Sequence, residues 1–92
     1  MQLLDEQDVQ QMLCEYLKRR RKLAKLSRQA LAERSGVPAA TIKHFETTGQ
    51  MSLRQFLRLW LALDDLNRLA ALAQTADTAR PATISEVLNN AL

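Results

Sequence analysis

Two side chains that can hydrogen-bond to another molecule, Lys43 and His44, stand side by side in a short helix-forming stretch. The helical repeat places them on one face with Ala39 and Ala40, opposite the apolar side chains of the same stretch. A lysine can donate to guanine or to a phosphate, a histidine can donate or accept at a base edge, and alanines can meet thymine methyl groups. The face therefore suits contacts to the edges of base pairs, with few hydrogen-bonding groups of its own.

The turn before this stretch is marked by Gly36, one of only two glycines in the chain. Glycine adopts the left-handed backbone conformation that ends a helix at little cost. Ser27 is predicted to be the N-cap of a helix that runs to about Arg34. A second helix is predicted to begin near Pro38, whose fixed φ suits a first helical position, and to run to about Glu46. A helix, a glycine turn and a second short helix form the geometry that offers a helix to the major groove of DNA.

Positive charge is concentrated around these two helices. Residues 1–16 carry four acidic residues and no Lys or Arg, residues 17–60 carry eleven basic residues against two acidic ones, and residues 61–92 carry two against four. Such a density attracts polyanions, of which nucleic acid is the favoured partner. The alternative is that bases in the last turns of a helix oppose its dipole. The densest part of the block comprises Lys18, Arg19, Arg20, Arg21, Lys22, Lys25 and Arg28.

Three further helices are predicted around this pair. Apolar residues at helical spacing indicate a first helix over residues 8–24. Ser52 and Gln55 form a capping-box pattern that begins a fourth helix, and the Asp64-Asp65 pair separates it from a fifth that runs to about residue 76. No stretch of useful length has the period of a strand, so the predicted class is all-α.

The chain is expected to divide into a helical domain over residues 1–76 and a linker with a short amphipathic tail over residues 77–92. Thr83 and Glu86 form a second capping-box pattern for this tail. A segment so short buries little by itself, so we expect it to contact a dimer mate or another protein, or else to fold back on its own core. The tail residues predicted to make this contact are Ile84, Val87, Leu88 and Leu92.

Catalysis and metal binding are disfavoured by composition. One cysteine, Cys14, and one histidine cannot assemble a four-ligand zinc site, and no glycine-rich phosphate loop is present. We expect no cofactor, no metal and no enzymatic activity, and we expect Cys14 to be a small buried hydrophobe. Neither a secretory signal nor a membrane-spanning run is found, so a cytoplasmic location is predicted.

A known family shares this pattern. Residues 26–37, with Thr41, Ile42, Phe45 and Glu46 after them, resemble the helix-turn-helix of the phage-repressor or Xre class, and the resemblance extends over roughly residues 9–75. It implies a five-helix, lambda-repressor-like DNA-binding domain, here followed by the short tail helix. It also implies a cytoplasmic homodimer that binds an inverted-repeat operator in double-stranded DNA.

The resemblance also implies roles for individual residues. Arg28 stands where the family often has Gln, and Pro38 stands where it often has Ser or Thr, so a charged contact and the loss of a side-chain cap are expected here. Gly36 sets the turn. The predicted base-reading residues are Ala39, Ala40, Lys43 and His44, and the predicted phosphate contacts are Ser27, Arg28, Thr41 and Thr47.

A narrower resemblance concerns residues 49–66, which are similar to helix-turn-helix antitoxins encoded beside HipA-type kinase toxins. It implies a HipB-like antitoxin that represses its own operon and contacts a kinase toxin. Two other interpretations stay open. The chain could be a stand-alone phage-type repressor, or a protein-interaction module without specific DNA binding.

Overall fold

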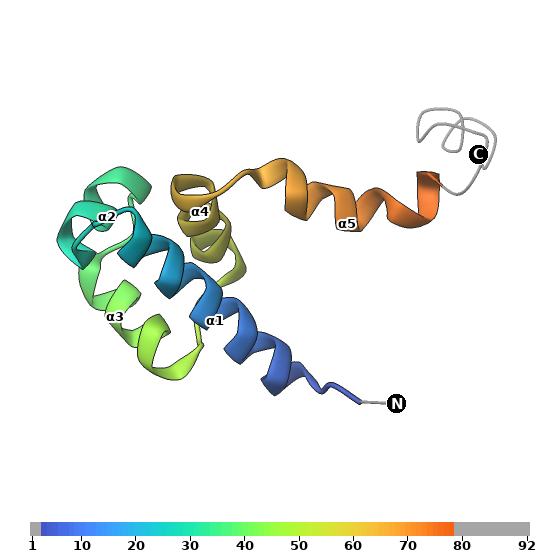
Figure 1. The fold of residues 1–92 in the computed structure, drawn as a ribbon, viewed down its shortest axis with the longest axis horizontal. Coiled ribbons are helices and arrows are strands. Elements are labelled where there is room, and N and C mark those ends of the chain that lie inside the picture. Colours follow the sequence, from blue (N-terminus) through green and yellow to red (C-terminus); the bar gives the residue numbers. More distant parts are fainter. Residues whose placement is uncertain (1–2, 79–92) are drawn as a thin grey trace.

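The computed structural model describes residues 3–78, which form five helices and contain no strand (Figure 1). The predicted all-α class and the order of the five helices are confirmed. Helices α1 to α4 pack around one core, whereas α5 extends away from them (Figure 1). The helices are α1 (Glu6–Leu23), α2 (Arg28–Ser35), α3 (Ala39–Thr48), α4 (Leu53–Leu63) and α5 (Leu66–Thr78).

Helix α1 begins two residues before the predicted start because two aspartates cap it. The Asp5 side chain accepts a hydrogen bond from the Asp8 N–H at 2.8 Å, and the Asp8 side chain accepts one from the Asp5 N–H at 3.2 Å. This reciprocal pair satisfies two backbone donors and places negative charge at the positive end of the helix dipole. At the other end, Lys25 turns the chain toward α2 with a φ of 58°.

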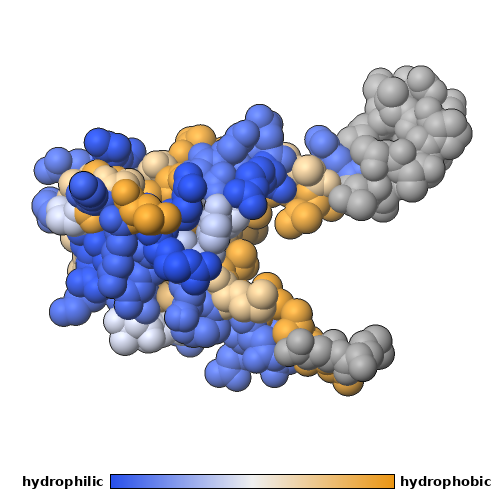
Figure 2. Space-filling view, in the orientation of Figure 1, coloured by the Kyte–Doolittle hydropathy of each residue, from blue (hydrophilic) through white to orange (hydrophobic). Residues whose placement is uncertain are grey.

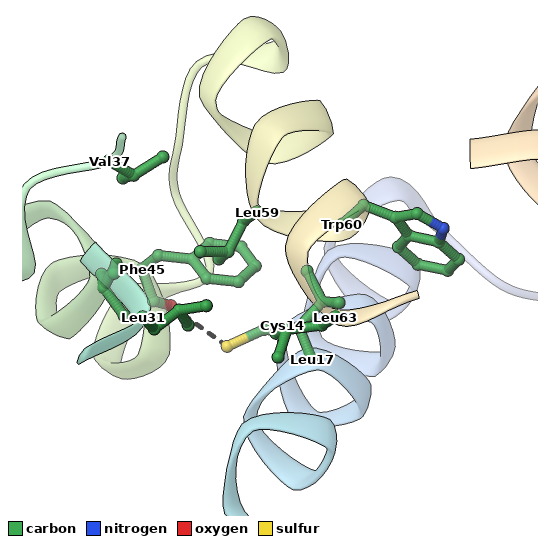
Figure 3. Close-up of a cluster of buried hydrophobic side chains, with 9 residues drawn as sticks. Cys14, Leu17, Leu31, Val37, Phe45, Leu59, Trp60 and Leu63 are labelled. Atoms are coloured by element: carbon green, nitrogen blue, oxygen red, sulfur yellow. Dashed lines mark hydrogen bonds between the residues drawn. The ribbon is translucent and has the colours of Figure 1, made fainter. Parts of the chain in front are cut away.

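The core lies between α1, α2, α3 and α4 (Figure 3). Cys14 is 1% exposed, and its thiol donates a hydrogen bond to the Phe45 carbonyl at 3.1 Å, so its predicted place as a small buried residue is confirmed. Burial, with a smaller contribution from the charge of Glu46, raises the pKa of this thiol. The buried core residues are Cys14, Leu17, Leu31, Val37, Ile42, Phe45, Leu59, Trp60 and Leu63.

The apolar stripes read from the sequence extend beyond this core. Val9, Met12 and Leu23 belong to the apolar pattern of α1 but lie on its surface. In α4 the buried face is formed by Leu59, Trp60 and Leu63, whereas Leu53 and Leu61, which the pattern places on the inner stripe, are exposed. Of the five residues that the apolar spacing of residues 53–61 groups on one stripe, Phe56, Leu57 and Trp60 are half-buried or buried, because an apolar run covers most of this helix and its period alone does not fix which side faces the core.

Helix α5 packs on α4 only through its first turn. Leu66 and Leu69 are half-buried against the core, whereas Ala70 and Leu72 are exposed. The helix continues to Thr78, so the first two residues of the expected linker are helical. The remainder of the predicted tail, with Ile84, Val87, Leu88 and Leu92, lies outside the described residues.

Candidate nucleic-acid interface

The connection between α2 and α3 is a tight turn at Gly36. This residue has a φ of +77°, and its N–H donates to the Ala32 carbonyl at 2.9 Å, which ends α2. Val37, fully buried, then anchors the turn in the core, and Pro38 precedes α3 without a side-chain cap. The left-handed conformation expected of Gly36 and the missing cap expected at Pro38 are both observed.

One face of α3 is turned to solvent. Ala40, Lys43 and His44 are exposed and Ala39 is half-buried, while Ile42 and Phe45 on the opposite face belong to the core. Within residues 3–78, no hydrogen bond or ion pair holds the side chain of Lys43 or His44. The four residues predicted to read bases therefore lie on one side of α3, and the two that can hydrogen-bond are free to meet a ligand.

Helix α2 begins at an N-terminus that Ser27 caps. The Ser27 hydroxyl accepts a hydrogen bond from the Ala30 N–H at 3.0 Å, as an N-cap should. Its own O–H is not used by this bond and can donate to an anion. The capping role and the phosphate contact predicted for Ser27 are therefore compatible.

Glu46 in α3 is the centre of a charged network that joins three helices. Its side chain is 3% exposed and accepts two hydrogen bonds from Arg21 of α1, from Nε at 2.7 Å and from Nη2 at 3.1 Å. Arg28 of α2 donates from Nε to the same carboxylate at 2.8 Å. A third bond of Arg21, from Nη1 to the Leu26 carbonyl at 2.8 Å, ties the turn between α1 and α2 to this network.

The protonation of Glu46 follows from these contacts. Burial raises the pKa of a carboxyl, but the hydrogen bonds and charges of Arg21 and Arg28 outweigh burial and hold the pKa of Glu46 below its usual value. Glu46 is thus a carboxylate that two guanidinium groups neutralise. Its position in the chain, as one of two acids in a basic stretch, was the signal in the sequence that could have indicated this role.

The residues predicted to contact phosphates differ in how free they are. The Arg28 side chain is 39% exposed and bound to Glu46 through Nε, which leaves its terminal nitrogens for another partner. Thr41 is half-buried. Thr47 is exposed, but its hydroxyl donates to the Lys43 carbonyl at 2.8 Å, so it would have to break this bond before donating to a phosphate.

The basic block does not form one uniform surface. Arg21 is 8% exposed and serves the network around Glu46, while Arg20 donates to the Leu63 carbonyl at the end of α4, from Nε at 3.1 Å and from Nη2 at 2.8 Å. Lys22 and Lys25 remain exposed. Some of these bases therefore hold the helices together, a role that neither the polyanion nor the helix-dipole interpretation anticipated.

Arg58 of α4 is a candidate that the sequence analysis missed. It is exposed, and its Nη1 lies 3.9 Å from the place that a Cβ at Gly36 would occupy. The Arg58 guanidinium therefore lies beside the turn between α2 and α3, although Arg58 itself belongs to α4. The spacing of Arg54 and Arg58, one helical turn apart, could have indicated a basic edge on α4.

Among residues 3–78 no helix is long and apolar enough to span a membrane. In the same part of the chain no group of three or more His, Cys, Asp or Glu side chains could hold a metal ion.

Comparison with known proteins gives one result for this site. Residues 17–50 match the family model described as "Helix-turn-helix". The match runs from the second half of α1 through the turn at Gly36 to the end of α3, which are the elements that position the exposed face. No curated protein and no solved structure matches the chain.

Proposed function

We propose that this chain is a dimeric, sequence-specific repressor, because residues 17–50 match the helix-turn-helix family model, and in the Xre class that element binds DNA in transcription regulators. The five helices fit the lambda-repressor-like all-α fold. Proteins of this family regulate transcription by binding DNA and are not normally enzymes. In the proposal, α3 enters the major groove and reads base edges.

The observation that carries the proposal is the solvent-facing side of α3. Lys43 and His44 project there without partners among residues 3–78, on a helix whose other side is locked in the core. In the proposal, Lys43 donates to guanine, His44 contacts a neighbouring base, and Ala39 and Ala40 meet thymine methyl groups. Since two of the four are alanines, we expect DNA shape and deformability to supply much of the specificity.

Phosphate contacts would fix the orientation of α3 on the duplex. Ser27 and the N-terminal amides of α2 are proposed to hold one phosphate, and the terminal nitrogens of Arg28 extend this site. Arg58 is proposed as a further contact beside the turn. Thr41 and Thr47 complete the predicted set, with the hydroxyl of Thr47 changing partners on binding.

The proposed assembly is a homodimer on an inverted repeat. Two copies would present their α3 helices to major-groove segments about 34 Å apart, one turn of B-DNA. Occupation of a promoter by such a dimer would repress transcription. The place of action is the cytoplasm, on the chromosome or on a phage-derived element.

The narrower proposal is that the chain is the autoregulating, HipB-like antitoxin of a HipA-type kinase toxin. It rests on the similarity of residues 49–66 to such antitoxins. The tail residues Ile84, Val87, Leu88 and Leu92 are proposed to contact the kinase or the dimer mate. The alternatives are a stand-alone phage-type repressor and a protein-interaction module without specific DNA binding.

The direct test is a titration of the protein against the duplex upstream of its own gene and against a scrambled duplex, at several salt concentrations. We expect preferential binding to the upstream duplex and a steep loss of affinity with salt, as phosphate contacts require. Lys43→Ala should weaken binding to the upstream duplex more than to the scrambled one, by about tenfold or more. Lys22→Ala, which removes an exposed lysine outside α3, is the charge-matched control and should weaken both equally.

Absence of binding to any duplex at low salt would favour the protein-interaction module instead. Adding the product of the neighbouring gene to the same titration separates the two repressor proposals. A kinase partner that binds this chain and changes its affinity for the operator supports the antitoxin. A chain that binds its operator but no neighbouring protein is the stand-alone repressor.

A further inference from the structure

A buried carboxylate belongs to the helix that we propose to face DNA. Glu46 follows Lys43 and His44 in α3, and its side chain is 3% exposed. Figure 2 shows a largely hydrophilic surface at the end of the molecule that holds α2 and α3, as suits contact with a polyanion. Glu46 and Glu33 are the only acids among the eleven bases of residues 17–60. A negative charge in this place should repel a phosphate backbone, so its presence needs a reason.

One arginine is enough to neutralise this carboxylate. Arg21 binds it through two nitrogens, at 2.7 and 3.1 Å, and so forms the forked pair that a guanidinium makes with a carboxylate. The Arg21 side chain is itself 10% exposed, and its third bond, to the Leu26 carbonyl, fixes it further. The ion pair between α1 and α3 is therefore complete without Arg28. The bond from Arg28 to Glu46 is an addition to this pair, and its consequence falls on Arg28.

This bond fixes one part of the Arg28 guanidinium and leaves the other part open. Nε donates to Glu46 at 2.8 Å, and the acceptor cannot shift because Arg21 holds it. A guanidinium carries its N–H donors in one plane, so the two terminal nitrogens keep theirs. Within residues 3–78 these nitrogens have no hydrogen bond, and the Arg28 side chain is 39% exposed although its partner is buried. Arg28 therefore presents free donors at a fixed angle.

These donors stand at the N-terminus of α2. Arg28 is the first residue of this helix, directly after the capping residue Ser27, and the Ser27 hydroxyl accepts from the Ala30 N–H. The N–H groups of Arg28 and Gln29 have no acceptor inside the helix, as in the first turn of any α-helix. Backbone donors, the helix dipole and a held guanidinium thus meet at one place, where a phosphate group is the best-matched anion.

We propose that Glu46 is a positioning residue for DNA binding, which holds the Arg28 guanidinium so that its terminal nitrogens meet a backbone phosphate at the start of α2. An arginine that is already held loses less rotamer freedom on binding than a free one does. This gain in affinity exceeds the repulsion from a carboxylate whose charge Arg21 neutralises. The inference rests on the proposed DNA binding and adds a buried acid to the groups that strengthen it. The alternative is that Glu46 only joins the helices and that Arg28 contributes nothing but its charge.

The first test keeps the charge at position 28 and changes its shape. A lysine has a single nitrogen, which cannot hold Glu46 and present a separate pair of donors to a phosphate. Arg28→Ala should lower affinity for the upstream duplex about tenfold, and Arg28→Lys about threefold or more. Arg34→Lys is the matched control and should bind like wild type, because Arg34 is exposed at the other end of α2 without a hydrogen bond or ion pair in residues 3–78. Equal binding by Arg28→Lys and wild type would overturn the proposal.

The second test is a double-mutant cycle between Glu46→Gln and Arg28→Ala, with DNA affinity as the readout. Glu46→Gln removes a negative charge, so electrostatics alone would raise affinity, whereas the loss of a charged acceptor for Arg28 should lower it about threefold. In the presence of Arg28→Ala there is no guanidinium to position, so the same change should no longer lower affinity. A purely structural role would lower affinity by the same factor with and without Arg28. Circular dichroism at the titration temperature checks that each variant is folded, and if Glu46→Gln is not, Arg28→Lys decides alone.

Two further readouts separate a lost phosphate contact from a displaced α3. Phosphate contacts carry no base sequence, so Glu46→Gln should weaken binding to the upstream and the scrambled duplex equally. It should also lower the slope of log affinity against log salt by about one, as Arg28→Ala does, although it removes no positive charge. A loss confined to the upstream duplex would mean that α3 has moved, and would overturn the proposal.

The same titrations distinguish failure of this inference from failure of the proposed repressor. If Lys43→Ala loses the upstream duplex selectively while Arg28→Lys binds like wild type, the repressor stands and the positioning role is refuted. If the cycle gives the expected coupling but wild type binds both duplexes equally well, the positioning role stands and sequence-specific reading is refuted. A wild type that binds no duplex refutes both.

Discussion

The two ends of the molecule expose opposite kinds of surface. At the end with α2 and α3, small and polar side chains face solvent, and the helices beneath them are joined by the buried carboxylate of Glu46 and its two arginines. At the other end, Leu4 and Met12 line a groove beside the start of α5, and Leu72 of α5 is also exposed. At the first end a buried charged network joins the helices, whereas at the second end apolar side chains are exposed to solvent.

This difference bears on what each end can bind. A face that presents lysine, histidine and alanine on a rigid helix forms wet, salt-sensitive contacts, as nucleic acid binding requires. An uncovered apolar groove gains free energy only when another apolar surface removes it from water. This comparison supports the proposal that the first end binds DNA, and the predictions below test how that end is held together.

The largest expected effect is the loss of the charged network. Glu46→Ala leaves the Arg21 guanidinium, with a side chain 10% exposed, without a counter-charge, so the free energy of unfolding should fall by about 3 kcal/mol. Urea unfolding followed by circular dichroism measures this value. Glu33→Ala removes an exposed acid of α2 and should change it by no more than about 0.5 kcal/mol. A loss of less than about 1 kcal/mol in Glu46→Ala would mean that charge does not hold this end together.

The next effect concerns the turn. Gly36→Val should lower the free energy of unfolding by about 2 kcal/mol, because a β-branched residue at a φ of +77° is strained. A Cβ there would meet only Arg58, at the ordinary distance of 3.9 Å, so the backbone and not crowding determines the cost. Operator affinity should fall with stability, since the turn sets the angle of α3. Gly36→Asn, which tolerates this conformation better, should lie between wild type and Gly36→Val, and normal folding and affinity in Gly36→Val would contradict the geometry.

Much of the first end was predictable from the sequence because local signals agree there. The cap at Ser27, the glycine at position 36 and the apolar spacing of Ile42 and Phe45 each constrain the same two helices. The exposed face of α3 follows from their period. The local sequence pattern could not predict which partner each basic residue binds, because the hydrogen bonds of Arg21 and Arg28 to Glu46 join positions far apart in the chain.

The second end was less predictable for a physical reason. Apolar spacing says that Met12 can be buried but not which surface covers it, and within residues 3–78 it is 58% exposed. Periodicity identifies an amphipathic helix, whereas the neighbours in three dimensions decide how much of the apolar face is covered.

A smaller effect should appear in the dependence of stability on pH. The folded pKa of Glu46 lies below its unfolded value, so its contribution to stability is fully present above the unfolded pKa and is lost as the pH falls through the folded pKa. Unfolding free energies measured from neutral pH downward should therefore fall less steeply in Glu46→Gln than in wild type. An identical pH dependence in the two proteins would show that this carboxylate does not contribute to acid unfolding.

The smallest expected effect concerns backbone strain at Lys25, in the turn between α1 and α2. Lys25 links α1 to α2 with a φ of 58°, a conformation that glycine adopts without a steric penalty, while its N–H donates to the Lys22 carbonyl and the Leu26 N–H donates to the Arg21 carbonyl. Lys25→Gly should keep these bonds and raise the free energy of unfolding by about 1 kcal/mol. Lys25→Ala removes the same charge but keeps the strain, so it should leave stability near that of wild type. If both variants lose DNA affinity equally while only the glycine variant gains stability, the charge of Lys25 contributes to DNA binding. The backbone strain at Lys25 is then the stability cost of placing a lysine at this turn.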